Sequence, residues 1–460
     1  METAQPVDRA PLAYAPNSQK RPMLPLVLAT ILFYLLLLPE QFHPRVGGIL
    51  VPAYRAYLIA MSLYFLTSGL KGWLRFTWVD LLVVGSAVWI LLASYQTSGS
   101  IATGFIQFGA HFVDITLAYF MARVAIRSPR DLRIFLILIA PGIGVTAFIV
   151  LQEAVTHVRF LQPLASSMTG VPMRLPDDTR LGFLRGAASF PHPILAGIFL
   201  ASLLPLYLAS GIRGWPKVIG IISAAIAFFT MSSAALLGLV AGTSLWFFDW
   251  MVEKIENLKW RMLLFFSAIM YTAVELTSNT GFYALLVRYA SLNTATAYNR
   301  VLIIRFGSEN IARNPWFGIG YDDWDRPVWM YSGSFDHFWL IMALRFGIPV
   351  LVMLGLATFV GIVSTAVKSN KVPLQDRRLL RGVAISLAVF SLGALSVSLW
   401  LSVLVWFSML LGIAVNFGRY QPDVVQNIQA PAATPTQNRS FQAPRHGQPV
   451  RPGQPITPAQ

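Results

Sequence analysis

The stretch Ile134–Leu151, with the sequence IFLILIAPGIGVTAFIVL, decides the fold class because it contains no charged residue. Six further runs that are nearly free of charge lie at Leu24–Leu38, Leu81–Ser94, Ile194–Ala209, Val218–Met231, Met262–Val274 and Phe338–Val367. Several of them approach the roughly 20 apolar residues that cross a hydrocarbon core. Backbone N–H and C=O groups cannot stay unpaired in lipid, so these segments are expected to be membrane-spanning helices.

The composition of the whole chain supports this interpretation. Apolar residues make up 55% of the 460 residues and charged residues only 12%, and the mean hydropathy is +0.60. A soluble protein uses about 25% charged residues, so the composition excludes an ordinary soluble protein of this length. The chain has no cysteine, which excludes disulfides and thiolate chemistry.

We expect an all-α integral membrane protein with about 12 transmembrane helices. The expected spans lie at roughly 23–39, 47–70, 79–95, 104–126, 132–153, 190–210, 215–231, 233–251, 261–277, 337–366, 380–395 and 397–417. Lys and Arg residues concentrate in every second turn between these spans, and the short turns near 96–103, 232 and 396 carry none. The positive-inside rule then places both termini on the cytoplasmic side of a bacterial inner membrane. The basic turns also account for much of the net charge of +15, so no nucleic-acid partner is expected.

The chain divides into one membrane domain, 23–420, and two polar ends. The segments 1–22 and 421–460 are predicted to be disordered and cytoplasmic, because both are polar and the tail is rich in Pro, Gln, Ala and Asn. Two outward, periplasmic loops are long, at about 153–189 and 277–336. Long loops on a rigid scaffold often carry function, so candidate site residues are sought there.

Two stretches at these loops carry specific motifs. In the first, Arg185 precedes Ala-Ser-Phe-Pro-His-Pro at 188–193, which opens a span. In the second, Arg300 precedes Asn-Pro-Trp-Phe-Gly-Ile-Gly at 314–320. An acidic, Trp-rich segment follows, and then Asp-His-Phe-Trp-Leu at 336–340 and Arg-Phe-Gly-Ile-Pro at 345–349.

The order of these motifs within this topology resembles the superfamily of O-antigen ligases and O-antigen polymerases, including exopolysaccharide polymerases. The resemblance covers roughly residues 130–416. Three positions depart from the family pattern: Asp336 stands where the family has His, His337 where it has Asn, and Ala188 where it often has Gly. The resemblance implies a GT-C-like fold that transfers glycan from an undecaprenyl-pyrophosphate carrier to an acceptor hydroxyl at the periplasmic face.

The residue types in the motifs suit that chemistry. The leaving pyrophosphate needs charge neutralisation, and the planar fork of arginine binds phosphate oxygens bidentately. Arg185 and Arg300 are therefore the expected pyrophosphate ligands. Further expected substrate contacts are Arg180, His192, Arg305 and Trp324. Arginine can neutralise the leaving group without a metal, and neither a metal site nor a cofactor is expected.

The acceptor hydroxyl needs a general base, and Asp336 and His337 are the two candidates. Motif alignment favours Asp336, whereas the ordinary pKa of histidine, about 6.5, favours His337. On that ground His337 is the preferred base here. The alternative is that the pair only caps a helix, with Asp336 as the N-cap residue.

The leading hypothesis is a polymerase of lipid-linked oligosaccharide repeat units in exopolysaccharide or O-antigen synthesis. Two alternatives stay open: a ligase that moves glycan to lipid A core or protein, and a flippase or other transporter for polysaccharide. The expected partners are the lipid bilayer, the undecaprenyl-pyrophosphate-linked glycan and other polysaccharide assembly or export proteins.

Overall fold

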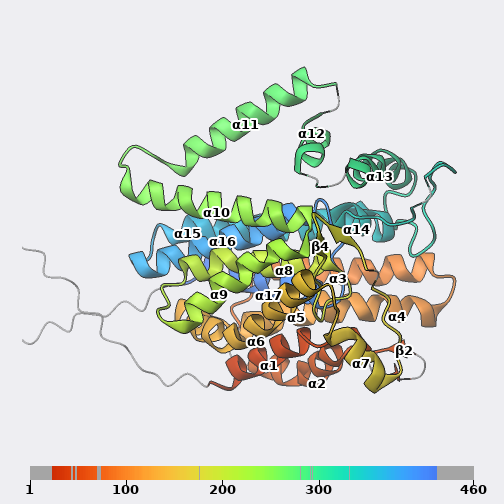
Figure 1. Ribbon diagram of the computed structural model, residues 1–460, viewed down its shortest axis with the longest axis horizontal. Helices are drawn as coiled ribbons and strands as arrows, with labels where there is room; N and C mark the ends of the chain where they lie inside the picture. Colours follow the sequence, from red (N-terminus) through yellow and green to blue (C-terminus); the bar gives the residue numbers. More distant parts are fainter. Residues whose placement is uncertain are drawn as a thin grey trace, which may run out of the picture. The chain divides into compact units, whose positions relative to one another are not determined.

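The computed structural model describes residues 23–42, 45–46, 49–69, 74–175, 177–279, 281–290, 292, 294–330 and 332–421. The two ends that are predicted to be disordered lie outside these residues. Nearly all the regular structure in the described part of the chain is helical (Figure 1). The strands form two short antiparallel hairpins, β1–β2 (Arg45–Val46, Ile49–Leu50) and β3–β4 (Thr179–Arg180, Phe183–Leu184).

The helices of the first half are α1 (Leu24–Leu36), the 3₁₀ turn η1 (Glu40–Phe42), α2 (Ala53–Ser68), α3 (Trp78–Thr97), α4 (Ile101–His111), the π-helical turn η3 (Phe112–Leu117), α5 (Ala118–Ala125), α6 (Pro129–Thr156), α7 (Leu161–Thr169) and α8 (Pro193–Ala209). Those of the second half are α9 (Trp215–Ala225), the 3₁₀ turn η4 (Ile226–Thr230), α10 (Ser233–Lys254), α11 (Trp260–Thr277), α12 (Gly281–Ala290), α13 (Thr294–Arg313), α14 (Phe338–Phe346), α15 (Ile348–Ser369), α16 (Leu374–Gly393) and α17 (Ser402–Gly418).

Two of the long helices, α3 and α6, begin at side chains that satisfy their first free N–H groups. At α3, Thr77 and Asp80 form a capping box, in which each side chain accepts a hydrogen bond from the other residue's backbone N–H. At α6, the Ser128 hydroxyl accepts from the N–H of Asp131, and Pro129 occupies the first helical position. Local sequence therefore determines where these apolar helices start.

The core lies where α8 packs against α10 and α16, and α17 packs against α5 and α15. At its centre the ring of Phe33 meets Trp406 edge-on at 5.4 Å between centroids, and the Trp406 indole donates to the Ser202 hydroxyl at 2.9 Å. Buried aromatic rings of this kind contribute large apolar contact areas, and the indole N–H is satisfied.

Among the described residues, five helices are long and apolar enough to cross a membrane: α3, the continuous segment Ile101–Ala125, α6, α10 and α15. Shorter apolar helices lie at α1, α8, Trp215–Thr230 and α17. These observations confirm an all-α protein with membrane-spanning helices. A helix lies within or across each of the twelve expected segments, but the number of spans and the orientation stay predictions.

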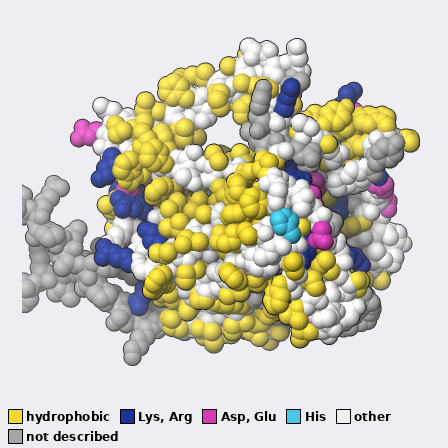
Figure 2. Space-filling view, viewed as in Figure 1, with side chains coloured by type: hydrophobic (Ala, Val, Ile, Leu, Met, Phe, Trp, Pro, Cys, Tyr) yellow, Lys and Arg dark blue, Asp and Glu magenta, His cyan; other side chains and the backbone are white. Residues whose placement is uncertain are grey.

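The outer surface is consistent with a lipid environment. Figure 2 shows hydrophobic side chains over most of the visible helices and Lys and Arg side chains gathered at the left edge. Leu63, Phe148 and Val240 are among the strongly exposed apolar residues. Helix α11 is the extreme case, because none of its side chains is buried. Apolar patches of this extent are unusual on a soluble monomer.

One expected span is wrong in detail. The segment 337–366 is not one continuous helix, because it breaks at Gly347 into α14 and α15. Gly347 has φ +88°, a left-handed value that favours glycine. Both flanks are apolar, so the hydropathy of the sequence gave no sign of the break.

The break exists because the Gly-Ile-Gly turn after α13 packs backbone to backbone against it. The N–H of Ile319 donates to the carbonyl of Leu344 at 2.8 Å, and Gly320 donates to Arg345 at 3.1 Å. The N–H of Ile348 donates back to the Pro315 carbonyl at 2.8 Å. The motifs at 314–320 and 345–349 are thus two halves of one interlocking structure.

We expect Gly347→Ala to disrupt this structure. An added Cβ would lie 1.8 Å from the Trp316 carbonyl oxygen, and φ is unfavourable as well. Overpacking and backbone strain each cost about 1–3 kcal/mol. The control is Gly355→Ala in α15, where a Cβ would meet no atom within 4 Å. The midpoint of thermal unfolding should fall clearly for purified Gly347→Ala and not for Gly355→Ala. Equal midpoints would contradict the close packing of the two motifs at 314–320 and 345–349.

Candidate functional site

Arg185 is held by the β3–β4 hairpin and the turn that follows it. Its backbone N–H donates to the Asp178 carbonyl at 3.0 Å, and its guanidinium Nη1 lies 2.9 Å from the Asp178 carboxylate. The Nη2 atom is buried and makes no hydrogen bond within the described residues. Burial lowers the pKa of Arg185 below its ordinary value, because the charged form is poorly solvated there. A buried guanidinium with one unsatisfied nitrogen is suited to accepting an anion.

The buried carboxylate of Glu153, at the end of α6, orders the turn behind Arg185. Its Oε2 accepts hydrogen bonds from the N–H groups of Ala187 and Ala188, at 2.8 and 3.1 Å, and lies 3.5 Å from the Arg159 guanidinium. Ala188 has φ +48°. A left-handed backbone explains why glycine would suit this position, and why alanine is strained there.

We expect Glu153→Gln to weaken both stability and function. The amide keeps one acceptor oxygen but loses the charge that faces Arg159, which still pairs with Asp177 at 3.0 Å. The expected cost is therefore that of a weakened buried hydrogen-bond network, about 1–3 kcal/mol. Glu309→Gln is the control, because Glu309 lies on an exposed stretch of α13. The midpoint of thermal unfolding in detergent should fall for Glu153→Gln and not for Glu309→Gln. An unchanged midpoint would show that the turn does not depend on this carboxylate.

Arg300 lies on the buried face of α13, and Arg180 connects it with Arg185. The charge of Arg180 acts on both Arg185 and Arg300, lowering the pKa of each, although burial has the larger effect on both. The charge of Asp336 also acts on Arg300 and opposes the lowering of its pKa by burial. The structure therefore brings Arg180, Arg185, Arg300 and Asp336 into one cluster, although 156 positions separate Arg180 from Asp336 in the sequence.

Asp336 and His337 differ in environment. The Nδ1 atom of His337 accepts the Leu340 N–H at 3.1 Å, so His337 is the N-cap of α14. The helix cap that the alternative expected is therefore present, but His337 and not Asp336 provides it. Burial lowers the pKa of His337 to about 4, which keeps the ring neutral at pH 7. Burial instead raises the pKa of Asp336, and the charge of Arg300 opposes this rise.

The hydrogen bond at His337 Nδ1 favours Asp336 as the proton acceptor. The ordinary pKa of histidine had favoured His337 instead. With Nδ1 used as an acceptor, a neutral His337 carries its proton on Nε2 and can only donate from there. The position also explains the asparagine that the resembled family has there, since the oxygen of asparagine is a favoured N-cap acceptor.

His192 is the N-cap residue of α8, as His337 is of α14. Its Nδ1 accepts the Ile194 N–H at 3.1 Å. Burial and then the charges of Arg185 and Arg180 lower its pKa to about 4. The ring lies 6.5 Å from that of Trp400. His192 therefore belongs to the arginine cluster as a neutral donor.

Asp336 also lines a cavity of about 600 Å³, which is within the usual range for small-ligand sites. Its walls include Trp324 and Trp400, and exposed Asp322 and Asp323 lie at its edge. The Trp324 indole donates to the Gly333 carbonyl at 3.3 Å, which fixes the ring against the loop. Aromatic rings beside carboxylates form a surface to which a sugar can bind by stacking and hydrogen bonding.

Arg305 is the one expected arginine contact that lies apart from the cluster. It is exposed on α13, and its guanidinium sits over the ring of the next residue, Phe306, at 5.5 Å.

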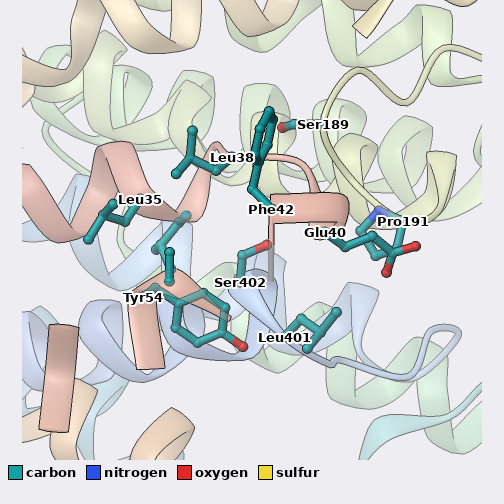
Figure 3. Close-up of a pocket in the computed structure, with 11 residues that line it drawn as sticks. Leu35, Leu38, Glu40, Phe42, Tyr54, Ser189, Pro191, Leu401 and Ser402 are labelled. Atoms are coloured by element: carbon teal, nitrogen blue, oxygen red, sulfur yellow. The ribbon is translucent and has the colours of Figure 1, made fainter. Parts of the chain in front are cut away.

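A second hollow borders the Arg185 turn at Ser189 and Pro191 (Figure 3). Glu40 is directed toward Pro191 there, but the volume of about 20 Å³ is that of one water molecule.

Sequence reasoning missed Tyr283 and undervalued Arg180. The ring of Tyr283, on α12, lies 6.2 Å from His337, and its hydroxyl donates to the Leu395 carbonyl at 2.9 Å. No motif marks Tyr283, so only the fold could reveal it. In the described part of the chain, no group of three or more His, Asp or Glu side chains could hold a metal ion.

No family model matches this chain, and comparison with curated proteins gave no match. The fold and the cluster together define a class: an all-α membrane protein with a buried arginine cluster, a carboxylate and an open cavity at the ends of its helices. The activity of that site is considered next.

Proposed function

We propose that the protein is a glycosyltransferase that polymerises undecaprenyl-pyrophosphate-linked oligosaccharide repeat units at the periplasmic face of a bacterial inner membrane. One observation carries the proposal. The charge of Arg180 acts on both Arg185 and Arg300, and Asp336, which acts on Arg300, lines the cavity. This arrangement supports a site with anion ligands, a base and room for a sugar.

The three arginines are suited to the leaving group. A pyrophosphate diester that departs from the anomeric carbon takes the bonding electron pair with it, and guanidinium groups stabilise the resulting charge. Arginine remains charged even where burial lowers its pKa, because its ordinary value is above 12.

Asp336 is suited to the acceptor. As the acceptor oxygen forms its bond to the anomeric carbon, its proton passes to the Asp336 carboxylate. The raised pKa makes this carboxylate a stronger base than an ordinary aspartate. The neutral His337 and His192 would orient hydroxyl or phosphate oxygens by donating from Nε2.

The test incubates purified protein in nanodiscs with an undecaprenyl-pyrophosphate-linked repeat unit and separates the lipid-linked products by length. Longer products support a polymerase. Product that forms only when lipid A core is added indicates a ligase. A third arm follows a fluorescent lipid-linked glycan across proteoliposomes, and transport without any transfer would overturn the enzyme assignment.

A further inference from the structure

The cavity beside Asp336 holds a second cationic group that the proposed transfer chemistry does not use. Arg345, near the end of α14, lines the same cavity as Asp336. Its guanidinium carbon lies 4.4 Å from the centroid of the Tyr321 ring, which also lines the cavity. Tyr321 in turn comes within 3.5 Å of His111 through its hydroxyl. Arg345, Tyr321 and His111 therefore form one wall.

Arg345 has no ion-pair partner among the residues that the structure describes. The neighbouring arginine, Arg55, is satisfied by Asp114 through two bonds, Nε to Oδ1 at 2.8 Å and Nη2 to Oδ2 at 2.6 Å. Arg345 is only half-buried, and its one side-chain neighbour of opposite polarity is the uncharged Tyr321, so its positive charge is not neutralised within the described residues. An ionisable residue inside an apolar helix, without a counter-ion, marks a site for an anion.

We propose that this cavity binds the acceptor glycan and that Arg345 binds the carboxylate of an acidic sugar, a uronic acid, within it. The proposal rests on the proposed function, in which the cavity faces the base Asp336. The exposed rings of Trp400 and Tyr321 provide stacking surfaces for sugar rings, and a carboxylate matches the bidentate edge of a guanidinium.

The charges around the cavity favour a single carboxylate over a second diphosphate. Asp322, Asp323 and Asp336 line it together with Arg345, and Asp323 already pairs with Arg326 at 2.5 Å. Arg345 can bind one carboxylate directly, whereas the neighbouring aspartates would repel a group with two or more negative charges more strongly. The donor side differs, because three arginines gather there.

The test is a binding measurement that needs no turnover. Purified full-length protein is titrated with trigalacturonate and with its carboxyl-reduced counterpart, and tryptophan fluorescence reports occupancy beside Trp324 and Trp400. We expect the acidic probe to bind about 10- to 100-fold more tightly, since charged hydrogen bonds contribute about 1.5–3 kcal/mol. Arg345→Gln should remove that preference and leave binding of the neutral probe unchanged.

Arg313→Gln is the matched control, because Arg313 pairs with Asp325 on an exposed surface and lines no part of this cavity. Arg345→Lys guards against misfolding of the glutamine variant, and it should retain part of the preference as a point charge. Equal binding of the two probes by the wild-type protein, no binding of the acidic probe, or an intact preference in Arg345→Gln overturns the inference. Chain extension is scored separately, so polymerase activity without an acidic preference removes only the acceptor assignment.

Discussion

Replacement of Arg185 or Arg300 by lysine should lower the rate of glycan transfer by about 10- to 100-fold, and replacement by alanine by more. Both side chains lie buried in the cluster around Arg180, where a flexible ammonium group cannot reproduce two parallel hydrogen bonds to phosphate oxygens. The measurement is the initial rate of lipid-linked chain extension by purified variants at equal amounts of folded protein.

Arg313→Lys is the control for this prediction, since the exposed pair of Arg313 with Asp325 should contribute little. The double variant of Arg185 and Arg300 should lose less than the product of the two single losses, because both arginines act on one leaving group. Full additivity would mean that the two arginines act on separate groups.

Asp336→Asn should reduce transfer by about 10²–10⁴-fold, the usual contribution of a general base. The wild-type rate should fall as the pH decreases through the pKa of Asp336. Burial raises that pKa, so the acid limb should lie above the ordinary aspartate value of about 3.8. Below it the carboxyl is protonated and cannot accept the acceptor's proton.

His337→Asn is expected to stay within about threefold of the wild type, because the asparagine oxygen can cap α14 in place of Nδ1. His337→Ala should lose the cap and about 1 kcal/mol of stability. His337, whose pKa burial lowers to about 4, should add no further inflection to the pH dependence of the transfer rate between pH 5 and 8. A profile whose acid limb disappears in His337→Asn and not in Asp336→Asn would reverse the two roles.

The sequence was sufficient to predict the helices and to select candidate residues for the site. It was not sufficient to predict how distant segments pack against one another. Charge-free runs such as Ile134–Leu151 have one stable form in lipid, so their helices follow from local physics. The break at Gly347 could not be read from hydropathy, because it depends on backbone hydrogen bonds to Pro315, Ile319 and Gly320, about 30 positions away. Contacts between distant segments leave no periodic signal in the chain.

The site shows the same limit. Arg185 and Arg300 stand out as motif residues, whereas the linking role of Arg180 depends on the β3–β4 hairpin. The preference for His337 as base rested on its ordinary pKa and stays a prediction, whereas the hydrogen bond that occupies its Nδ1 is visible only in the fold. The number of spans, their orientation and the activity itself stay predictions.

Helix α11 has a consequence for how this chain can vary. A residue in a packed core must fit its neighbours in shape, but none of the side chains of α11 is buried within the protein. Acyl chains are fluid and adapt to any apolar outline. Selection on α11 would therefore act on its overall hydrophobicity and length and not on the identity of each residue, so scrambling its apolar positions should be nearly silent, whereas the same exchange in α17 should not.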